Sequence, residues 1–164
     1  MTRIASAEEV LLSGALNSWN SAVERADKLF SGLSAEELQK EIATGKNRLI
    51  YLWGHLTAVH DAMLPLLGFG ARLHSEFDAV FISKPDRSAP DMPSAEVVKK
   101  SWNEVNGKLR DGFTKLSAAE WLERHSAVSA EDFAKDPLRN RFAILLSRTN
   151  HVAYHYGQAV LATK

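Results

Sequence analysis

Apolar residues recur at intervals of three and four positions along four long segments of this chain. On an α-helix this spacing gathers apolar side chains on one face, and the only strand-like alternation is a short one at residues 79–82. Helices with one apolar face bury those faces best against one another. The spacing therefore predicts an all-α protein, a four-helix bundle. A chain of 164 residues can form one domain, residues 1–164, around a single core.

Local signals indicate where the four helices begin and end. Ser6 and Glu9 form a capping box, in which each side chain binds a free backbone N–H of the first helical turn. The fourth helix is predicted to begin at Asp136–Pro137, because a proline at the first helical position loses no hydrogen bond. The second helix is predicted to follow Gly45 and end at Gly68 and Gly70, and the third to begin near Ser94.

Two short helices, near residues 34–40 and 117–124, are predicted to link the long ones. Each starts with a capping box and follows a long helix, so the chain has two similar halves. The connection after the second helix, residues 67–93, is long and contains several glycines and prolines. A connection of this length is usually functional or a crossover, and a crossover would give a bundle other than up-down-up-down.

The charge balance and the lack of cysteine exclude several classes of function. Twenty basic and twenty acidic residues cancel, which argues against binding to nucleic acid or to a membrane surface. The chain has no cysteine, so disulfides, thiolate zinc ligands and a cysteine nucleophile are excluded. Any metal must be bound by His, Asp, Glu or water. We see no signal peptide or membrane-length apolar run and expect a cytoplasmic protein.

Three histidines are the candidate metal ligands. His151 and His155 are four residues apart, so on a helix they lie on one face and can bind one divalent ion. The glutamate that follows the first histidine of zinc proteases is absent, since Val152 occupies that position. His55, in the second helix, lies about 60° from the centre of its apolar face and is close enough to face the bundle interior. A catalytic zinc site would keep a further position open.

The other histidines fit such a site less well. His60 lies about 140° around the helix from His55, so we interpret it as a residue at the boundary of the core. His74 in the long connection and His125 after the second linker are expected at the surface. His151 and His155 lie more than a right angle from their helix's apolar row, which predicts a site at a rim or open groove of the bundle.

The context of these histidines resembles the DinB/YfiT-like metalloenzyme family. The matching residues are Gly54, His55 and Leu56 in the second helix, and His151, His155, Gly157 and Gln158 in the fourth. The resemblance covers essentially the whole chain. It implies a four-helix bundle in which His55, His151 and His155 bind one metal ion, commonly zinc or nickel. It also implies a thiol-dependent enzyme, because the family includes transferases and isomerases that use low-molecular-weight thiols.

The ligand set leaves several activities open. Three neutral imidazoles leave a divalent ion its full charge, so a thiol or water bound to it loses its proton near neutral pH. A thiolate would carry out S-transfer or detoxification, and a hydroxide would carry out hydrolysis. No Asp or Glu lies within one turn of His151 or His155, so a nearby general base is not evident. The alternative that the bundle binds metal or a small ligand without catalysis therefore stays open. A structural protein with incidental histidines is the remaining alternative.

Candidate substrate contacts lie near these ligands. Arg148 is one turn before His151 and Arg48 is two turns before His55, so either could hold an anionic substrate or thiol, although a solvated surface arginine is the simpler interpretation. Gln158 is the third candidate. We expect a small-molecule substrate and no nucleic acid or membrane partner. Trp53 and Trp121 do not fall on the predicted apolar faces, so we expect them to be exposed. Exposed aromatic side chains of this kind could form the contact of a homodimer.

Overall fold

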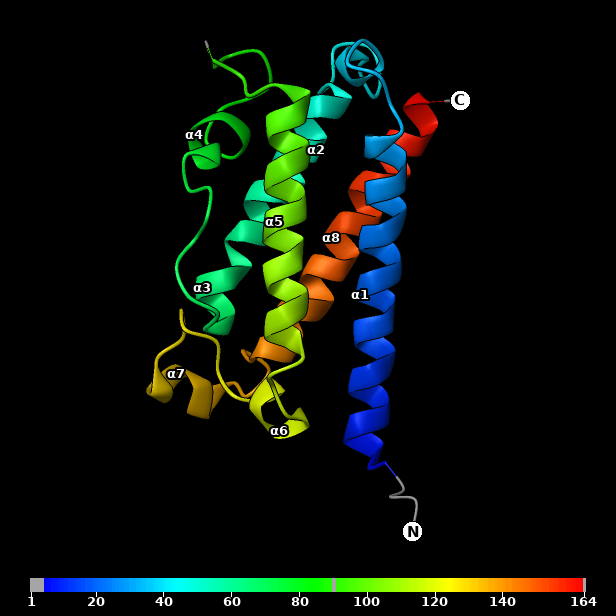
Figure 1. Ribbon diagram of the computed structural model, residues 1–164. Coiled ribbons are helices and arrows are strands. Elements are labelled where there is room, and N and C mark those ends of the chain that lie inside the picture. Colours follow the sequence, from blue (N-terminus) through cyan, green and yellow to red (C-terminus); the bar gives the residue numbers. More distant parts are fainter. Residues whose placement is uncertain (1–4, 90, 164) are drawn as a thin grey trace.

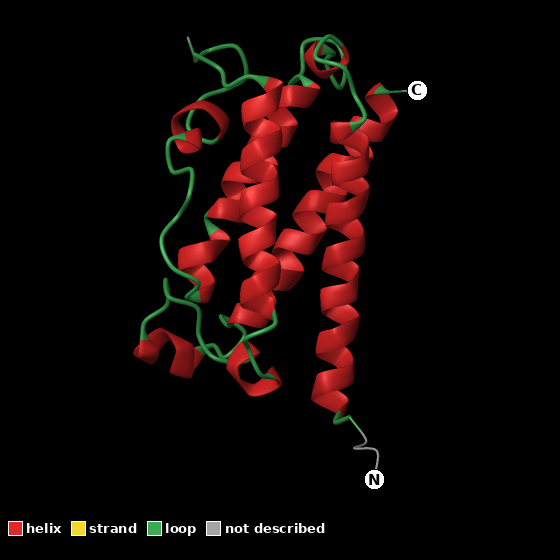
Figure 2. Ribbon diagram, in the orientation of Figure 1, coloured by secondary structure: helices red, strands yellow, loops and turns green. Residues whose placement is uncertain are grey.

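The four predicted long helices are present and pack side by side. The structure, a computed structural model, describes residues 5–89 and 91–163. The long helices are α1 (Ala7–Ser31), α2 (Leu49–Asp61), α5 (Ala95–Phe113) and α8 (Arg141–Ala162) (Figure 1). Over the described residues there is no β-strand, and only two isolated bridges pair extended backbone (Figure 2). The all-α bundle is confirmed.

The bundle has a crossover connection. Figure 1 shows that α1 and α8 run in one direction and that α2 and α5 run in the other. α1 packs mainly against α8, and α2 mainly against α5. After α2 the chain forms the short helix α3 (Met63–Leu67), returns along the bundle through α4 (Phe77–Phe81) and enters α5 at the same end as α2. The long connection therefore sets the order of the helices, as a crossover would.

The capping boxes begin helices where predicted. At Ser6 and Ser117 both reciprocal hydrogen bonds of the box are formed, and Ser117 starts α6 (Ala118–Trp121). Ser34 and Glu37 also bond each other's backbone N–H, but this box begins only a single 3₁₀ turn, η1 (Glu37–Gln39). These signals succeed because both partners lie within one turn of the same chain.

The second helix is shorter than predicted. It breaks at Ala62, and the chain continues as α3 to Gly68, which has the left-handed φ of 82° typical of a glycine C-cap. Pro65 accounts for the break, because a proline has no N–H to bond the carbonyl four residues earlier and its ring collides with that carbonyl. The predicted stop at Gly68 is confirmed, whereas the single uninterrupted helix was wrong.

The start predicted for the fourth helix was also wrong. Asp136 ends a short helix, α7 (Ala130–Lys135), by donating its N–H to the Asp132 carbonyl. α8 begins five residues later, where the Asn140 side chain accepts from the N–H of Ala143. Leu138, which follows the predicted start at Asp136–Pro137, lies outside α8 and is 77% exposed. The sequence signals at Asp136 and at Asn140 are chemically alike, and the contacts of the folded chain select the second.

The residues 79–82 form no strand. Residues up to Phe81 belong to α4, and Phe77 and Phe81 are both buried against the bundle. Two apolar residues four apart fit one face of a helical turn. α4 therefore covers one side of α2 and becomes part of the wall around the candidate site.

The core is rich in tryptophan, and two of its tryptophans contradict the sequence interpretation. Trp53 and Trp121, expected at the surface, are each only 1% exposed, like Trp102. The Trp53 ring stacks on Phe30 at 5.6 Å, and Trp121 packs against Phe113 at 5.3 Å between ring centroids. Helices from elsewhere in the chain cover both side chains, so neither supports a homodimer contact.

Buried ion pairs hold the crossover connection to the bundle. The fully buried carboxylate of Asp61 accepts the backbone N–H groups of Leu73 and His74 and the Nε–H of Arg72. Arg72 also pairs with Asp78. Farther along, Asp86 binds both the backbone N–H and the guanidinium of Arg48. These bonds fix the segment that carries α4.

Candidate metal centre

The structure brings the three predicted histidines together. His55 lies on α2, and His151 and His155 lie one turn apart on α8. Nε2 of His151 is 3.2 Å from Nε2 of His55 and 3.1 Å from Nε2 of His155. One ligand atom from each residue lies within 4.8 Å of the others. Ligands of a single ion at bonds of about 2.0–2.1 Å must lie within about 4.2 Å of one another, so the shortest of these separations suit one shared ion.

The outer nitrogen of His55 is held by α4. Its Nδ1–H donates to the Phe81 carbonyl oxygen at 2.9 Å, which leaves Nε2 unprotonated and aimed at the other two rings. Gly54 makes this contact possible, because a Cβ at that position would lie 2.3 Å from the Phe81 ring. The Gly54-His55 sequence is therefore explained by packing. The absence of a side chain at Gly54 lets Phe81 pack against α2, and the Phe81 carbonyl then orients the His55 ring.

Gln158 orients His155 in the same way. The Nδ1–H of His155 donates to the Gln158 side-chain oxygen at 2.7 Å, and the Gln158 amide nitrogen donates to the Tyr154 hydroxyl at 3.0 Å. Metal-binding histidines typically donate their second N–H to such an acceptor, which fixes the tautomer and the ring orientation. Two of the three imidazoles therefore present a bare Nε2 to the centre.

Two of the rings, those of His151 and His155, have lowered pKa values, which favour the neutral form that binds metal. Burial, with a smaller effect of the positive charges of His155, His55 and Arg148, lowers the pKa of His151 to about 4. Burial also lowers the pKa of His155, against the opposing effect of its bond to Gln158. The buried Nδ1 of His151 has no hydrogen-bond partner. Three imidazole nitrogens that face one point could hold a divalent metal ion.

The comparison with known families agrees with this geometry. A sequence profile of the DinB superfamily matches residues 19–159. The chain belongs to the DinB superfamily. The crystal structure of a conserved protein from Enterococcus faecalis has a similar fold, with a TM-score of 0.63 over 92% of this chain and 96% of the other. The two sequences are 15% identical, so this likeness concerns the fold alone. No curated protein matches the chain.

The three histidines are partly exposed to solvent, in keeping with the rim position that the sequence predicted. All three histidines are half-buried, and the fully buried residues of α8, such as Leu145 and Val152, lie on a neighbouring face. Among the described residues, the group that could hold an ion contains no carboxylate. Within the same residues, no helix is long and apolar enough to cross a membrane. The centre of this DinB-superfamily chain is thus a set of three partly exposed imidazole nitrogens.

The other predicted contacts have different environments. Arg48 caps the start of α2 and is bound by Asp86 at 2.6 Å and by Gln39 at 2.6 Å, so its charge is already neutralised within the protein. Gln158 contacts His155 rather than open space. Arg148 is half-buried, and its Nε has no hydrogen-bond partner. Of the three candidates, Arg148 alone keeps a guanidinium without a protein acceptor.

His60 was misplaced by the sequence interpretation. It is fully buried rather than at the boundary of the core, and its ring lies between Trp19 at 4.6 Å and Trp102 at 5.0 Å. Its Nδ1–H donates to the Asn106 side-chain oxygen at 2.9 Å. Burial lowers the pKa of His60 to about 3, so the ring is neutral. A polar residue at position 106 on the apolar face of α5 was the signal that could have revealed this pair.

His74 and His125 are not part of the centre. His74 bonds Glu104 at 3.0 Å across the crossover connection. His125, which follows α6, is partly buried, and burial lowers its pKa. The expectation that neither is a ligand agrees with these positions.

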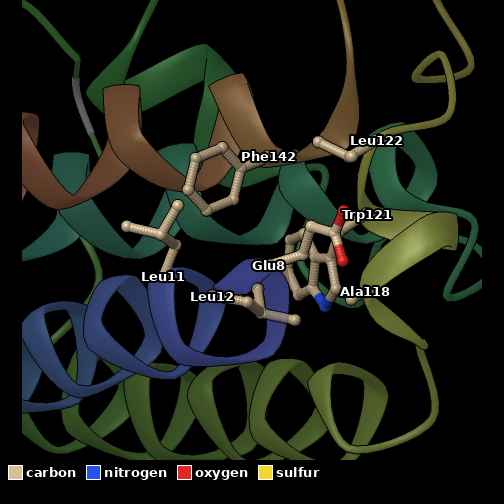
Figure 3. Close-up of a pocket in the computed structure, with 7 residues that line it drawn as sticks. All are labelled: Glu8, Leu11, Leu12, Ala118, Trp121, Leu122 and Phe142. Atoms are coloured by element: carbon tan, nitrogen blue, oxygen red, sulfur yellow. The ribbon is translucent and has the colours of Figure 1, made fainter. Parts of the chain in front are cut away.

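A separate apolar pocket lies at the other end of α8. It has a volume of about 170 Å³, and Figure 3 shows its lining of α1, α6 and α8 side chains, among them Leu11, Trp121 and Phe142. Phe142 precedes His151 by nine residues, which is roughly 14 Å along a helix axis. The pocket therefore does not belong to the histidine centre.

Proposed function

We propose that this chain is a metal-dependent enzyme that uses His55, His151 and His155 to hold one divalent ion and that transfers a thiol to a small electrophilic molecule. The observation that carries the proposal is the convergence of three Nε2 atoms, two of them at 3.1 and 3.2 Å from the third. Membership of the DinB superfamily supports the same assignment.

The protein's own residues would prepare the centre before any ligand arrives. Phe81 and Gln158 fix the tautomers of His55 and His155, so that both rings offer a lone pair without rearrangement. The lowered pKa of His151 keeps its ring neutral at neutral pH, so that one ring nitrogen has a free lone pair. A divalent ion held by neutral ligands lowers the pKa of a thiol or water that reaches it. The half-exposed side of the centre leaves room for that molecule.

The lack of a nearby carboxylate favours a thiol over water as nucleophile. Metal-dependent hydrolases commonly place a glutamate beside the ion as a general base. Here the hydrogen-bond partners of the three imidazoles are one another, a backbone carbonyl and an amide. A thiol that has lost its proton to solvent needs no such base. Its sulfur would form a bond to the electrophilic carbon, and the displaced group would leave with the bonding electrons.

Metal analysis followed by a thiol panel tests this proposal. The purified protein should bind one equivalent of zinc or nickel, and His151→Ala should abolish binding while the helical circular dichroism stays unchanged. His125→Ala, which alters a histidine outside the centre, is the matched control. The metal-loaded protein should then accelerate the reaction of one or more bacterial thiols with a generic electrophile such as a chlorodinitroarene.

The outcomes separate the alternative functions. Ester hydrolysis without thiol transfer would favour a hydrolase. Stoichiometric metal with neither reaction would favour a bundle that binds metal or a small ligand without catalysis. Protein that binds no metal at all would refute the proposal and leave a structural role.

A further inference from the structure

One arginine, on the turn of α8 before His151, has no hydrogen-bond or ion-pair partner among the described residues. The structure describes four partly buried arginines, and three of them pair with a carboxylate: Arg48 with Asp86, Arg72 with Asp61 and Asp78, and Arg141 with Glu123. The fourth, Arg148, forms no hydrogen bond or ion pair with any described residue, and its Nε is buried.

An unpaired guanidinium in such a place is energetically unfavourable. A charge that leaves water needs an opposite charge or hydrogen bonds to compensate for its lost hydration. Burial is the one cause that lowers the pKa of Arg148, since no carboxylate opposes it. The chain therefore retains a cation that an anion from outside would stabilise.

The position of Arg148 ties it to the centre. It precedes His151 by three residues on α8, so their Cβ atoms are about 5–6 Å apart. The charge of Arg148 also lowers the pKa of both His151 and His60. Its field therefore reaches the histidine centre.

We propose that Arg148 binds the carboxylate of a small ligand whose other end reaches the histidine centre, so that the substrate or thiol of this protein is a carboxylic acid. This inference rests on the proposed function. A guanidinium presents parallel N–H donors that match a carboxylate in a bidentate pair. A phosphate dianion is better matched by two cations, and the other partly buried arginines are already neutralised by Asp and Glu.

The spacing indicates which probe to use. A two-carbon linker between a sulfur and a carboxylate matches the one-turn separation of His151 and Arg148. The probe is 3-mercaptopropionate, and its neutral isostere 3-mercaptopropionamide differs only in the group that Arg148 would contact.

The experiment measures binding rather than turnover. The protein is loaded with cobalt(II), whose visible spectrum reports thiol binding, and each thiol is titrated at fixed pH and ionic strength. The wild type should bind the acid roughly tenfold more tightly than the amide, the range expected for a hydrogen bond to a charged group. Arg148→Gln should lose that preference, while Arg148→Lys should keep part of it. Arg110→Gln, which removes an exposed arginine of α5, should behave as wild type.

Each result decides the inference. Equal affinities for acid and amide in the wild type, or an unchanged preference in Arg148→Gln, would overturn the role of Arg148 and leave the proposed function intact. A protein that binds cobalt but neither thiol, or that binds no cobalt, would overturn the proposed function and this inference with it. Circular dichroism of each variant verifies that the helices remain folded.

Discussion

At the scale of single residues, the centre depends on groups that would not touch a bound ion. His55 and His155 each donate their outer N–H to a fixed acceptor, Phe81 in one case and Gln158 in the other. Such acceptors hold the ring in position and keep the correct tautomer. Gln158, which the sequence suggested as a substrate contact, has its oxygen occupied by His155.

Gln158→Ala should therefore weaken metal binding. The Nδ1–H of His155 would lose its acceptor, and a loss of roughly tenfold or more in zinc affinity is expected. Competition with a chromophoric chelator measures this change. Tyr154→Phe, which removes only the hydroxyl at the far end of the network, should have a smaller effect. Unchanged zinc affinity in Gln158→Ala would show that the glutamine does not position the ring.

His60 should make the protein sensitive to acid. Its pKa is about 3 in the folded protein and about 6.5 in the unfolded chain, so the unfolded chain binds the extra proton between these values. The stabilisation of the folded protein by the neutral His60 ring is complete above pH 6.5, and it is lost as the pH falls toward 3. At most it amounts to about 5 kcal/mol.

His60→Gln isolates this contribution, because glutamine can still donate to Asn106 but does not titrate. Urea unfolding of both proteins between pH 7 and pH 4 should show a shallower loss of stability in the variant. Parallel pH profiles would mean that other groups, such as His151, account for the acid sensitivity.

At the scale of elements, close packing of α4 on α2 builds one wall of the centre. Phe81 lies against the helix backbone at Gly54, where any side chain would collide with it. α1 offers a contrast, since the space around Gly14 contains no atom within 4 Å of an added Cβ. Two helical glycines thus have opposite structural roles.

Gly54→Ala should destabilise the protein by about 1–3 kcal/mol, because the added methyl group must displace the Phe81 ring. Gly14→Ala should instead stabilise it by about 0.5–1 kcal/mol, the gain expected for alanine in an open helical position. Denaturant midpoints of both variants measure the difference. Equal midpoints would show that α4 does not pack on α2 as described.

At the scale of the whole molecule, one ion would tie α2 to α8. His55 and His151, which lie on these helices, are 96 residues apart in the chain, and a ligand that binds only the folded chain stabilises it. Zinc at a hundred times its Kd should add about 2.7 kcal/mol, which raises the Tm by roughly 5–10 °C for a chain of this size.

A thermal scan with and without zinc measures this effect. His155→Ala should remove it, whereas His74→Ala should not, since His74 bonds Glu104 outside the centre. An equal rise in wild type and His155→Ala would mean that zinc binds elsewhere.

The sequence by itself determined the features whose causes are local. The apolar spacing predicted the four helices, the capping boxes at Ser6 and Ser117 predicted two helix starts, and Gly68 predicted a stop. The pair His151 and His155 shares a face because helical geometry places residues four apart together. Together with the Gly-His motif at residue 55, these signals were sufficient to name the three histidines that converge.

Only the tertiary structure decided features whose partners lie far along the chain. The partner of Arg48 is 38 residues away, and His60 owes its burial to Trp19 and Trp102 on other helices. The choice of Asn140 over Asp136 as the start of α8, and the burial of Trp53 and Trp121, likewise depend on neighbouring elements. No local pattern encodes these contacts, because they form only when the crossover connection has placed the four helices.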